Sequence, residues 1–165
     1  MSHRHWPSPD VHAKYALKFW AHNFNGVAVH LRHRDVAFVA VSGAPYVQLD
    51  RYRELMGWTF RWVSSYGSDF NRDFGVSFDD DQRGHGAEFN HSPQESPPDE
   101  APGMSAFATD ADGTVFHTYS TYSRGLGPIN GCYQMLDLVA KGRDEGVLPW
   151  TMAWVQRHDA YPTSG

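Results

Sequence analysis

Hydrophobic and polar positions recur with distinct periods over the first third of the chain. From residue 12 to residue 33, apolar side chains return every three or four positions, which predicts an amphipathic helix lying on a sheet. The run Val36–Val41 is continuously apolar and rich in β-branched residues, the pattern of a central strand buried on both faces. A second helix is predicted from Tyr46 to Met56, where Gly57 ends it.

The stretch from Trp58 to Phe78 holds seven aromatic side chains, and the rest of the chain is interpreted around it. Phe60 and Trp62 alternate with less apolar residues, so residues 59–64 are predicted to form a strand with one buried face. The order helix, strand, helix, strand predicts a parallel crossover and an α/β layer architecture. Core packing explains these aromatic residues more simply than a function does.

Composition changes at residue 79. Acidic residues, glycines and prolines dominate residues 79–103, which predicts a long surface loop without reliable secondary structure. Two strands, at residues 104–109 and 114–119, flank a turn sequence that ends in Gly113 and form a hairpin that closes the sheet. Two further helices are expected, at residues 129–140 and 149–158.

Length and charge narrow the classes of partner. The chain has 165 residues, enough for one domain, which we place at residues 12–161 after an extended segment at residues 1–11. Its 14 basic and 19 acidic residues give a net charge of −5, which disfavours nucleic acids and anionic membranes as partners. No apolar run approaches the roughly 20 residues that span a bilayer, and no apolar segment of signal-peptide type follows the basic residues near the N-terminus, so we expect a cytoplasmic protein.

Cys132 is the only cysteine in the chain. One thiol excludes an intrachain disulfide, a dithiol couple and a cysteine-rich zinc site. It falls on the apolar stripe of its helix, between Ile129 and Leu136, where burial raises a thiol pKa and lowers its reactivity. A structural role is therefore favoured over a catalytic one-thiol centre.

Five sequence blocks, in order, carry a family resemblance over residues 18–161: FWAHNFNGVAVHLRHRDVAFVAVSGAP, MGWTFRWVSSYGSDFNRDFGVSF, DADGTVFHTYSTYSRGL, NGCYQMLDLVAKGRDE and MAWVQRHDAY. They closely resemble the bacterial domain-of-unknown-function 899 family. Its members are thioredoxin-like and are often labelled predicted dithiol-disulfide oxidoreductases. The resemblance implies a thioredoxin-like fold with a mixed central sheet flanked by helices.

The chain departs from the family pattern in two ways. The family places a Cys-x-x-Cys segment before the Phe-Trp pair, and the matching positions here are Lys14 and Leu17. Dithiol exchange is therefore not expected. The sheet strand that precedes the first helix in the family is also replaced or truncated. Three explanations stay open: residues 3–9 pair as a substitute strand, a second copy of the chain covers the edge as a homodimer, or the chain is a truncated gene product.

Polar and aromatic residues near the expected groove are the candidates for binding. His117 alternates with Val115 and Tyr119 along its strand, in a hydroxyl-rich run that also contains Arg124. Pro102 matches the place where thioredoxin folds carry a cis-proline beside the active site. Such a pocket would take a small anionic or aromatic molecule, although a hydrogen-bonded strand end explains the same run. The candidate binding residues are Trp20, Trp62, Pro102, His117, Tyr119 and Arg124.

Histidines supply the candidates for a metal site. His30 and His33 share a helix face, but neighbouring arginines oppose a cation. His85 and His91 lie in the acidic segment without a recognised ligand spacing. Met1 and His3 could chelate a copper or nickel ion through the terminal amine. No cofactor is expected, and a divalent metal is the alternative.

Three functional hypotheses follow. The first is a thioredoxin-like protein that has lost its cysteine pair and binds a small molecule or a protein. The second is an enzyme that uses a His-bound metal or Cys132. The third is a truncated oxidoreductase with no independent activity.

Overall fold

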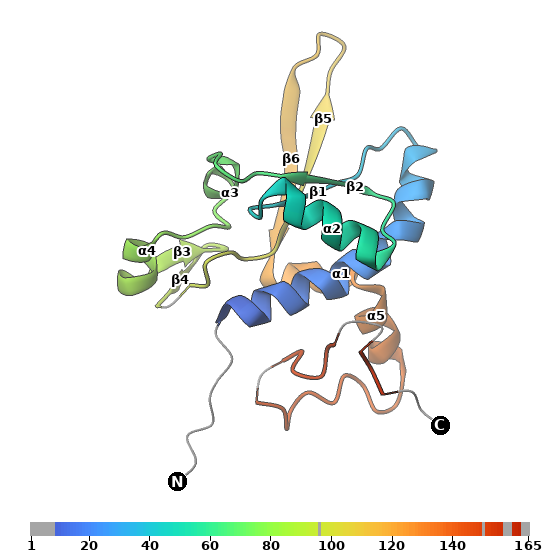
Figure 1. Cartoon of the computed structure of the whole chain (residues 1–165), viewed down its shortest axis with the longest axis vertical. Coiled ribbons are helices and arrows are strands. Elements are labelled where there is room, and N and C mark those ends of the chain that lie inside the picture. The colour runs from blue at the N-terminus through green and yellow to red at the C-terminus, as the bar shows by residue number, and fades with distance from the viewer. Residues whose placement is uncertain (1–8, 96, 150, 157–159, 163–165) are drawn as a thin grey trace.

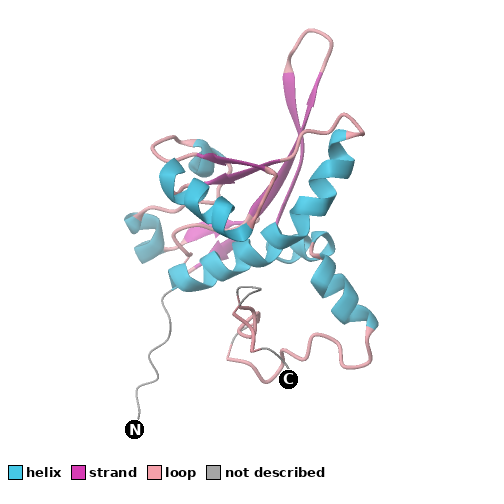
Figure 2. Ribbon diagram, turned by 45° about the vertical axis from the view of Figure 1, so that its right-hand side comes forward, coloured by secondary structure: helices cyan, strands magenta, loops and turns pink. Residues whose placement is uncertain are grey.

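The computed structural model describes residues 9–95, 97–149, 151–156 and 160–162. The described residues form an α/β structure of helices and three small two-stranded sheets (Figures 1 and 2). No helix among these residues is both long enough and apolar enough to cross a membrane.

The first half of the chain forms the predicted parallel crossover. It consists of α1 (Pro9–Arg32), β1 (Val39–Ser42), α2 (Tyr46–Met56) and β2 (Arg61–Ser64). The strands β1 and β2 pair in parallel, with Val39 opposite Arg61. Gly57 ends α2 in the left-handed conformation, where its missing Cβ removes the steric cost. The helix, strand, helix, strand order is therefore confirmed.

Aromatic side chains from α1 and the Trp58–Trp62 segment form the core. Trp58 and Phe60 are 4% and 3% exposed, and they pack with Ala21 and Met56. The Trp58 ring lies 5.4 Å from Phe60 and 5.3 Å from Trp62, between ring centroids. Burying one such side chain contributes about 1.5–3 kcal/mol. The interpretation of this aromatic segment as core is confirmed for its first half.

The strand predicted at Val36–Val41 is shorter and more exposed than expected. It begins at Val39, and Val36 and Val39 are 47% and 38% exposed. Among the described strands, β1 pairs only with β2. The prediction of a central strand buried on both faces is wrong: β1 is an edge strand among the described residues, Val36 lies before it, and no packed layer buries Val36 or Val39.

The second half of the chain builds two further sheets instead of extending the first. The antiparallel pairs β3–β4 and β5–β6 are each separate two-stranded sheets, so the expected closure of one mixed sheet is wrong. The hairpin itself is confirmed, with strands longer than predicted, and it projects from the body of the molecule (Figure 1). The elements are α3 (Phe70–Asp73), α4 (Asp80–His85), β3 (Ala87–Phe89), β4 (Ser92–Gln94), β5 (Gly103–Thr109), β6 (Val115–Tyr122), the 3₁₀ helix η1 (Ser123–Ile129) and α5 (Gly131–Leu138).

The segment at residues 79–103 contains regular structure, contrary to the prediction of a loop. Asp79 caps α4 by accepting a hydrogen bond from the Gln82 backbone at 2.9 Å, and the Gln82 side chain accepts one from the Asp79 backbone at 3.1 Å. This reciprocal capping satisfies two backbone donors that would otherwise lack partners. Arg83 then pairs with Asp99 and ties α4 to the chain before β5.

Polar contacts shape the C-terminal region. The helix predicted at residues 149–158 is wrong for residues 151–154, which form turns. Residues 150 and 157–159 lie outside the described part of the chain. One oxygen of Glu145 accepts hydrogen bonds from the Tyr133 hydroxyl at 2.8 Å, the Met152 backbone at 3.0 Å and the Trp154 indole at 2.7 Å. These three bonds hold the turn against α5.

The structure describes residues 9–11 of the predicted N-terminal segment. Apart from Pro9, the substitute strand expected within residues 3–9 lies outside the described residues, as do Met1 and His3. Helix α1 begins at Pro9, so residues 9–11 are helical and the extended segment predicted there is wrong.

Candidate functional site

A bulge in β6 decides which side chains share a face. Ala106 pairs with Tyr119, whereas the next residue, Phe107, pairs with His117, so Thr118 is the extra residue of β6. An extra residue reverses the alternation of side chains beyond it. His117 therefore shares its face with Ser120 and Tyr122. The two-residue spacing predicted that His117 and Tyr119 lie on one face of the strand, and this prediction is wrong.

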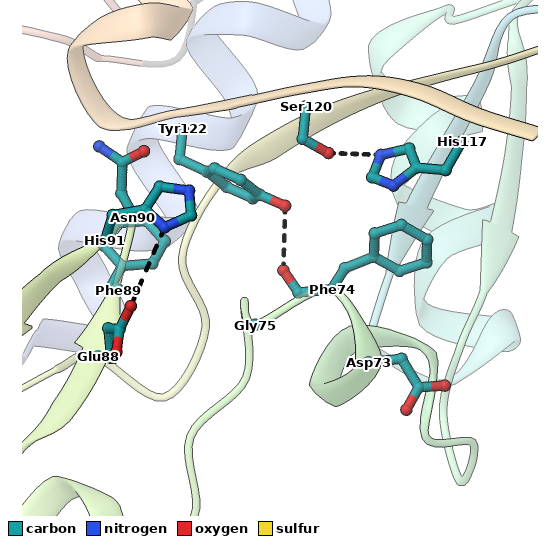
Figure 3. A pocket seen from close by; sticks show the side chains of 10 residues that line it. All are labelled: Asp73, Phe74, Gly75, Glu88, Phe89, Asn90, His91, His117, Ser120 and Tyr122. Carbon is teal, nitrogen blue, oxygen red and sulfur yellow. Dashed lines mark hydrogen bonds and ion pairs between the residues drawn. The ribbon is translucent and has the colours of Figure 1, made fainter.

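An open cleft of about 390 Å³ lies on this face. Figure 3 shows His117 and Phe74 on one side and the β3–β4 turn, with Tyr122, on the other. The cleft thus brings together three segments that are distant in the sequence: the end of α3, the β3–β4 turn and β6. Its lining consists of Asp73, Phe74, Gly75, Glu88, Phe89, Asn90, His91, His117, Ser120 and Tyr122.

The contacts of His117 assign a proton to one of its two ring nitrogens. Nε2 lies 3.0 Å from the carbonyl oxygen of Tyr119 and 2.6 Å from the Ser120 hydroxyl. A carbonyl oxygen can only accept, so Nε2 carries the proton and donates it. In the neutral ring Nδ1 is then an acceptor, and no described residue bonds to it. This arrangement also argues against Ser120 as a nucleophile, because Nε2 cannot take its proton.

Aromatic rings hold the imidazole in place. The His117 ring stacks on Phe107 with centroids 5.1 Å apart, and it meets Phe74 edge to face at 5.5 Å. The Tyr122 hydroxyl donates to the Phe74 carbonyl oxygen at 3.2 Å, which joins β6 to the end of α3. The imidazole is exposed, and these ring contacts together with the two Nε2 contacts orient it.

The charges around the cleft are acidic. Asp73 and Glu88 contribute carboxylates, and Glu88 lies 4.0 Å from Nδ1 of His91. None of the ten described lining residues is Lys or Arg. An anionic molecule would meet no permanent positive charge here, so the lining favours the aromatic alternative over the anionic one.

The structure brings one of the six predicted binding residues into this cleft, namely His117. The Trp20 indole instead donates to the Leu126 carbonyl oxygen at 3.3 Å, and Trp62 packs in the core. Tyr119 and Arg124 are exposed elsewhere. A binding role for these residues stays a prediction.

Pro102 does not have the expected backbone geometry. The described residues contain no cis peptide bond. The cis-proline suggested for Pro102 by the family resemblance is therefore wrong, and the residue is half-buried just before β5.

Cys132 is partly buried near the start of α5, where burial raises the pKa of its thiol. The inference of a raised pKa from the apolar helix stripe is confirmed. A raised thiol pKa leaves little thiolate at neutral pH, which opposes the one-thiol centre.

The candidate metal ligands do not converge. Among the described residues, no three His, Cys, Asp or Glu side chains gather as a metal site. His30 and His33 are exposed at the end of α1, His85 pairs with Asp81, and His91 lies beside Glu88. A metal at these residues stays a prediction without support from their placement.

The sequence interpretation missed the β3–β4 side of the cleft. Asn90 and His91 both have positive φ, at 52° and 60°, and form a two-residue turn between Phe89 and Ser92. Asn at the first position of such a turn favours a tight hairpin. That signal was present, but the surrounding glycines and prolines favoured a loop.

Together, the fold and the cleft define an α/β protein with an open, aromatic-walled surface site. Comparison with protein families then places the chain: residues 6–161 match the family described as "Bacterial protein of unknown function (DUF899)". The chain belongs to this family, which confirms the resemblance found in its sequence. Comparisons with curated proteins and with solved structures gave no match.

Proposed function

We propose that this member of the DUF899 family binds a small, planar aromatic molecule that carries hydrogen-bond donors, and that it does so without dithiol chemistry. The observation that carries the proposal is the cleft beside β6, where the fixed His117 ring presents an acceptor nitrogen among aromatic side chains. Concave sites with aromatic walls and few oriented polar groups are the usual form of small-molecule sites.

The ligand's charge follows from the same side chains. Glu88 and Asp73 only accept hydrogen bonds when ionised, and Nδ1 of neutral His117 also accepts. Aromatic faces such as those of Phe89 and Tyr122 attract cations and repel anions. A planar cation with N–H donors is therefore preferred over an isosteric anion.

We further propose that the scaffold is thioredoxin-related and has given up thiol exchange. The support is the sequence resemblance together with the order α1, β1, α2, β2 and the later β5–β6 hairpin. Lys14 and Leu17 stand at the positions of the family's cysteine pair, and Cys132 alone cannot form an internal disulfide. In a disulfide-reduction assay, the wild-type protein and Cys132→Ser should be equally inactive, and turnover by either would contradict this part.

Three isosteric probes test the binding proposal. Isothermal titration with benzamidine, benzamide and benzoate compares a planar cation, a neutral amide and an anion of nearly equal shape. We expect benzamidine to bind most tightly, benzamide more weakly and benzoate not at all. Equal binding of all three, or preference for benzoate, would contradict the proposed charge preference.

Variants then assign the binding to the cleft. His117→Ala should weaken benzamidine binding about tenfold or more, since it removes the acceptor and one ring. Glu88→Gln should reduce the difference between benzamidine and benzamide, because it removes a charge and keeps the shape. Glu54→Gln, on the exposed face of α2, is the matched control and should bind as the wild type does. Unchanged binding in His117→Ala would exclude this cleft as the site.

A further inference from the structure

A second cavity lies at the carboxyl end of the parallel strands β1 and β2, where α/β proteins commonly bind ligands. It measures about 180 Å³ and begins directly after the two strands, at Gly43 and Ser65. The structure places polar side chains from two later segments here. The cavity is lined by Gly43, Ser65, Tyr66, Gly67, Ser68, Asn71, Arg72, Ser77 and Glu100.

A chain of hydrogen bonds orders the polar groups of this cavity. The buried Ser65 hydroxyl donates to Oδ1 of Asn71 at 2.9 Å, and Nδ2 of Asn71 donates to Oε1 of Glu100 at 3.0 Å. The segment that carries Glu100 is also anchored, because the backbone of the next residue, Ala101, donates to the Val76 carbonyl oxygen at 2.7 Å. Asn71 thus positions Oε1 of the Glu100 carboxylate.

Gly43 leaves room for the Glu100 carboxylate at the end of β1. A Cβ built on Gly43 would lie 1.9 Å from Oε1 of Glu100, closer than any side chain can approach. The absence of a side chain at the end of β1 therefore lets a carboxylate reach the strand end. The other oxygen, Oε2, has no hydrogen-bond partner among the described residues and stays available to a ligand.

The chemistry of the lining selects the ligand. The fixed carboxylate of Glu100 repels phosphates and carboxylates and accepts from donors. The Arg72 guanidinium supplies donors at the same cavity, and serine hydroxyls both donate and accept. Groups that donate and accept at neighbouring positions are hydroxyls, and the exposed ring of Tyr66 offers a flat face for the C–H side of a ring.

We infer that this cavity binds a neutral cyclic polyol, such as a sugar-like ring, through Glu100, Arg72 and the serine hydroxyls. This site is separate in its residues from the His117 cleft, since the two linings share no member. The inference therefore does not depend on the proposed function.

Three six-membered rings test the inference by amide chemical shifts. Titrations use myo-inositol with six hydroxyls, cyclohexanol with one, and cyclohexylamine with one positive charge. We expect saturable shifts at Gly43, Gly67 and Ser68 with myo-inositol only. Absence of saturable shifts with myo-inositol would overturn the inference. Equal shifts with cyclohexanol would also overturn it, as would tighter binding of cyclohexylamine, which would indicate an amine site.

Variants and a competition complete the test. Glu100→Gln keeps the shape of the side chain and should weaken myo-inositol binding about tenfold. Arg72→Ala changes an exposed side chain outside the hydrogen-bond chain and should weaken binding several-fold even if Glu100→Gln does not fold. Glu54→Gln should leave it unchanged. Wild-type affinity in Arg72→Ala would overturn the assigned contacts.

An excess of benzamidine should leave the myo-inositol shifts in place. Because the two ligands are measured separately and together, loss of benzamidine binding at the His117 cleft can be told from loss of myo-inositol binding at the Glu100 cavity. Displacement of myo-inositol by benzamidine would overturn the separation of the two sites.

Discussion

The α1–β2 crossover and the β5–β6 hairpin use aromatic side chains in opposite ways. In the crossover of α1, β1, α2 and β2, Trp58 and Phe60 are almost completely buried. In the β5–β6 hairpin, Phe107 and Phe116 are about half exposed, at 48% and 50%. Helices cover the first sheet, whereas the end of the hairpin extends beyond the body of the molecule (Figure 2). Coverage by a second layer, and not aromatic content, therefore decides which rings form a core.

The largest expected effect tests this comparison directly. Trp58→Ala should lower the free energy of unfolding by about 3–5 kcal/mol, because it leaves a cavity among packed rings. Phe116→Ala should lower it by about 1 kcal/mol or less, since half of that ring already contacts water. Urea denaturation of both variants measures the difference, and equal losses would contradict the distinction between core and surface rings.

A polar contact should have the next largest effect. Glu145→Ala removes the oxygen that accepts from Tyr133, Met152 and Trp154. Because these donors lose a charged partner, we expect a loss of about 2–3 kcal/mol in the free energy of unfolding. A loss below that of Phe116→Ala in the same urea series would show that Glu145 does not hold the C-terminal turn.

The thiol of Cys132 gives a pH-dependent test of burial outside the aromatic core. Burial raises its pKa above the ordinary value of 9.0, so the folded chain keeps the proton longer than the unfolded chain does. Below pH 9 this group does not change stability; above it, stability falls until the pH passes the folded pKa. The alkylation rate of the folded protein should rise at higher pH than that of the same protein in urea. A rise at lower pH would indicate an activated thiol.

The smallest expected effect concerns the cap of α4. Asp79→Ala should destabilise this helix by about 1 kcal/mol, because the Gln82 backbone loses its acceptor. Amide hydrogen exchange at Gln82 should therefore accelerate, while exchange in the Trp58 core stays unchanged. Asp112→Ala, at the exposed hairpin turn, is the matched control. Unchanged exchange at Gln82 would support the original prediction of an irregular loop.

Local signals predicted the elements that local chemistry determines. Helix α2 has the predicted bounds because Gly57 adopts the left-handed conformation that ends the helix. The Asp110–Gly113 turn likewise identified its hairpin, since Gly113 adopts φ 83°. These features depend on a few neighbouring residues, which the sequence displays directly.

Features that depend on distant partners were not predicted. The exposure of Val36 and Val39 depends on whether another element packs over them, which their own apolar pattern does not report. The cleft depends on the bulge at Thr118, which turns His117 toward Ser120, and on the β3–β4 turn brought from elsewhere in the chain. His117 was identified from its chemistry, but its neighbours required the three-dimensional structure.

The central claim is that the aromatic cleft beside the β5–β6 hairpin holds a planar ligand next to His117. Nuclear Overhauser effects measured between benzamidine ring protons and protein side chains test it most directly. The account predicts contacts to Phe74, His117 and Tyr122, which face the cleft in Figure 3. Contacts confined to other residues, or no contacts with bound benzamidine, would contradict it.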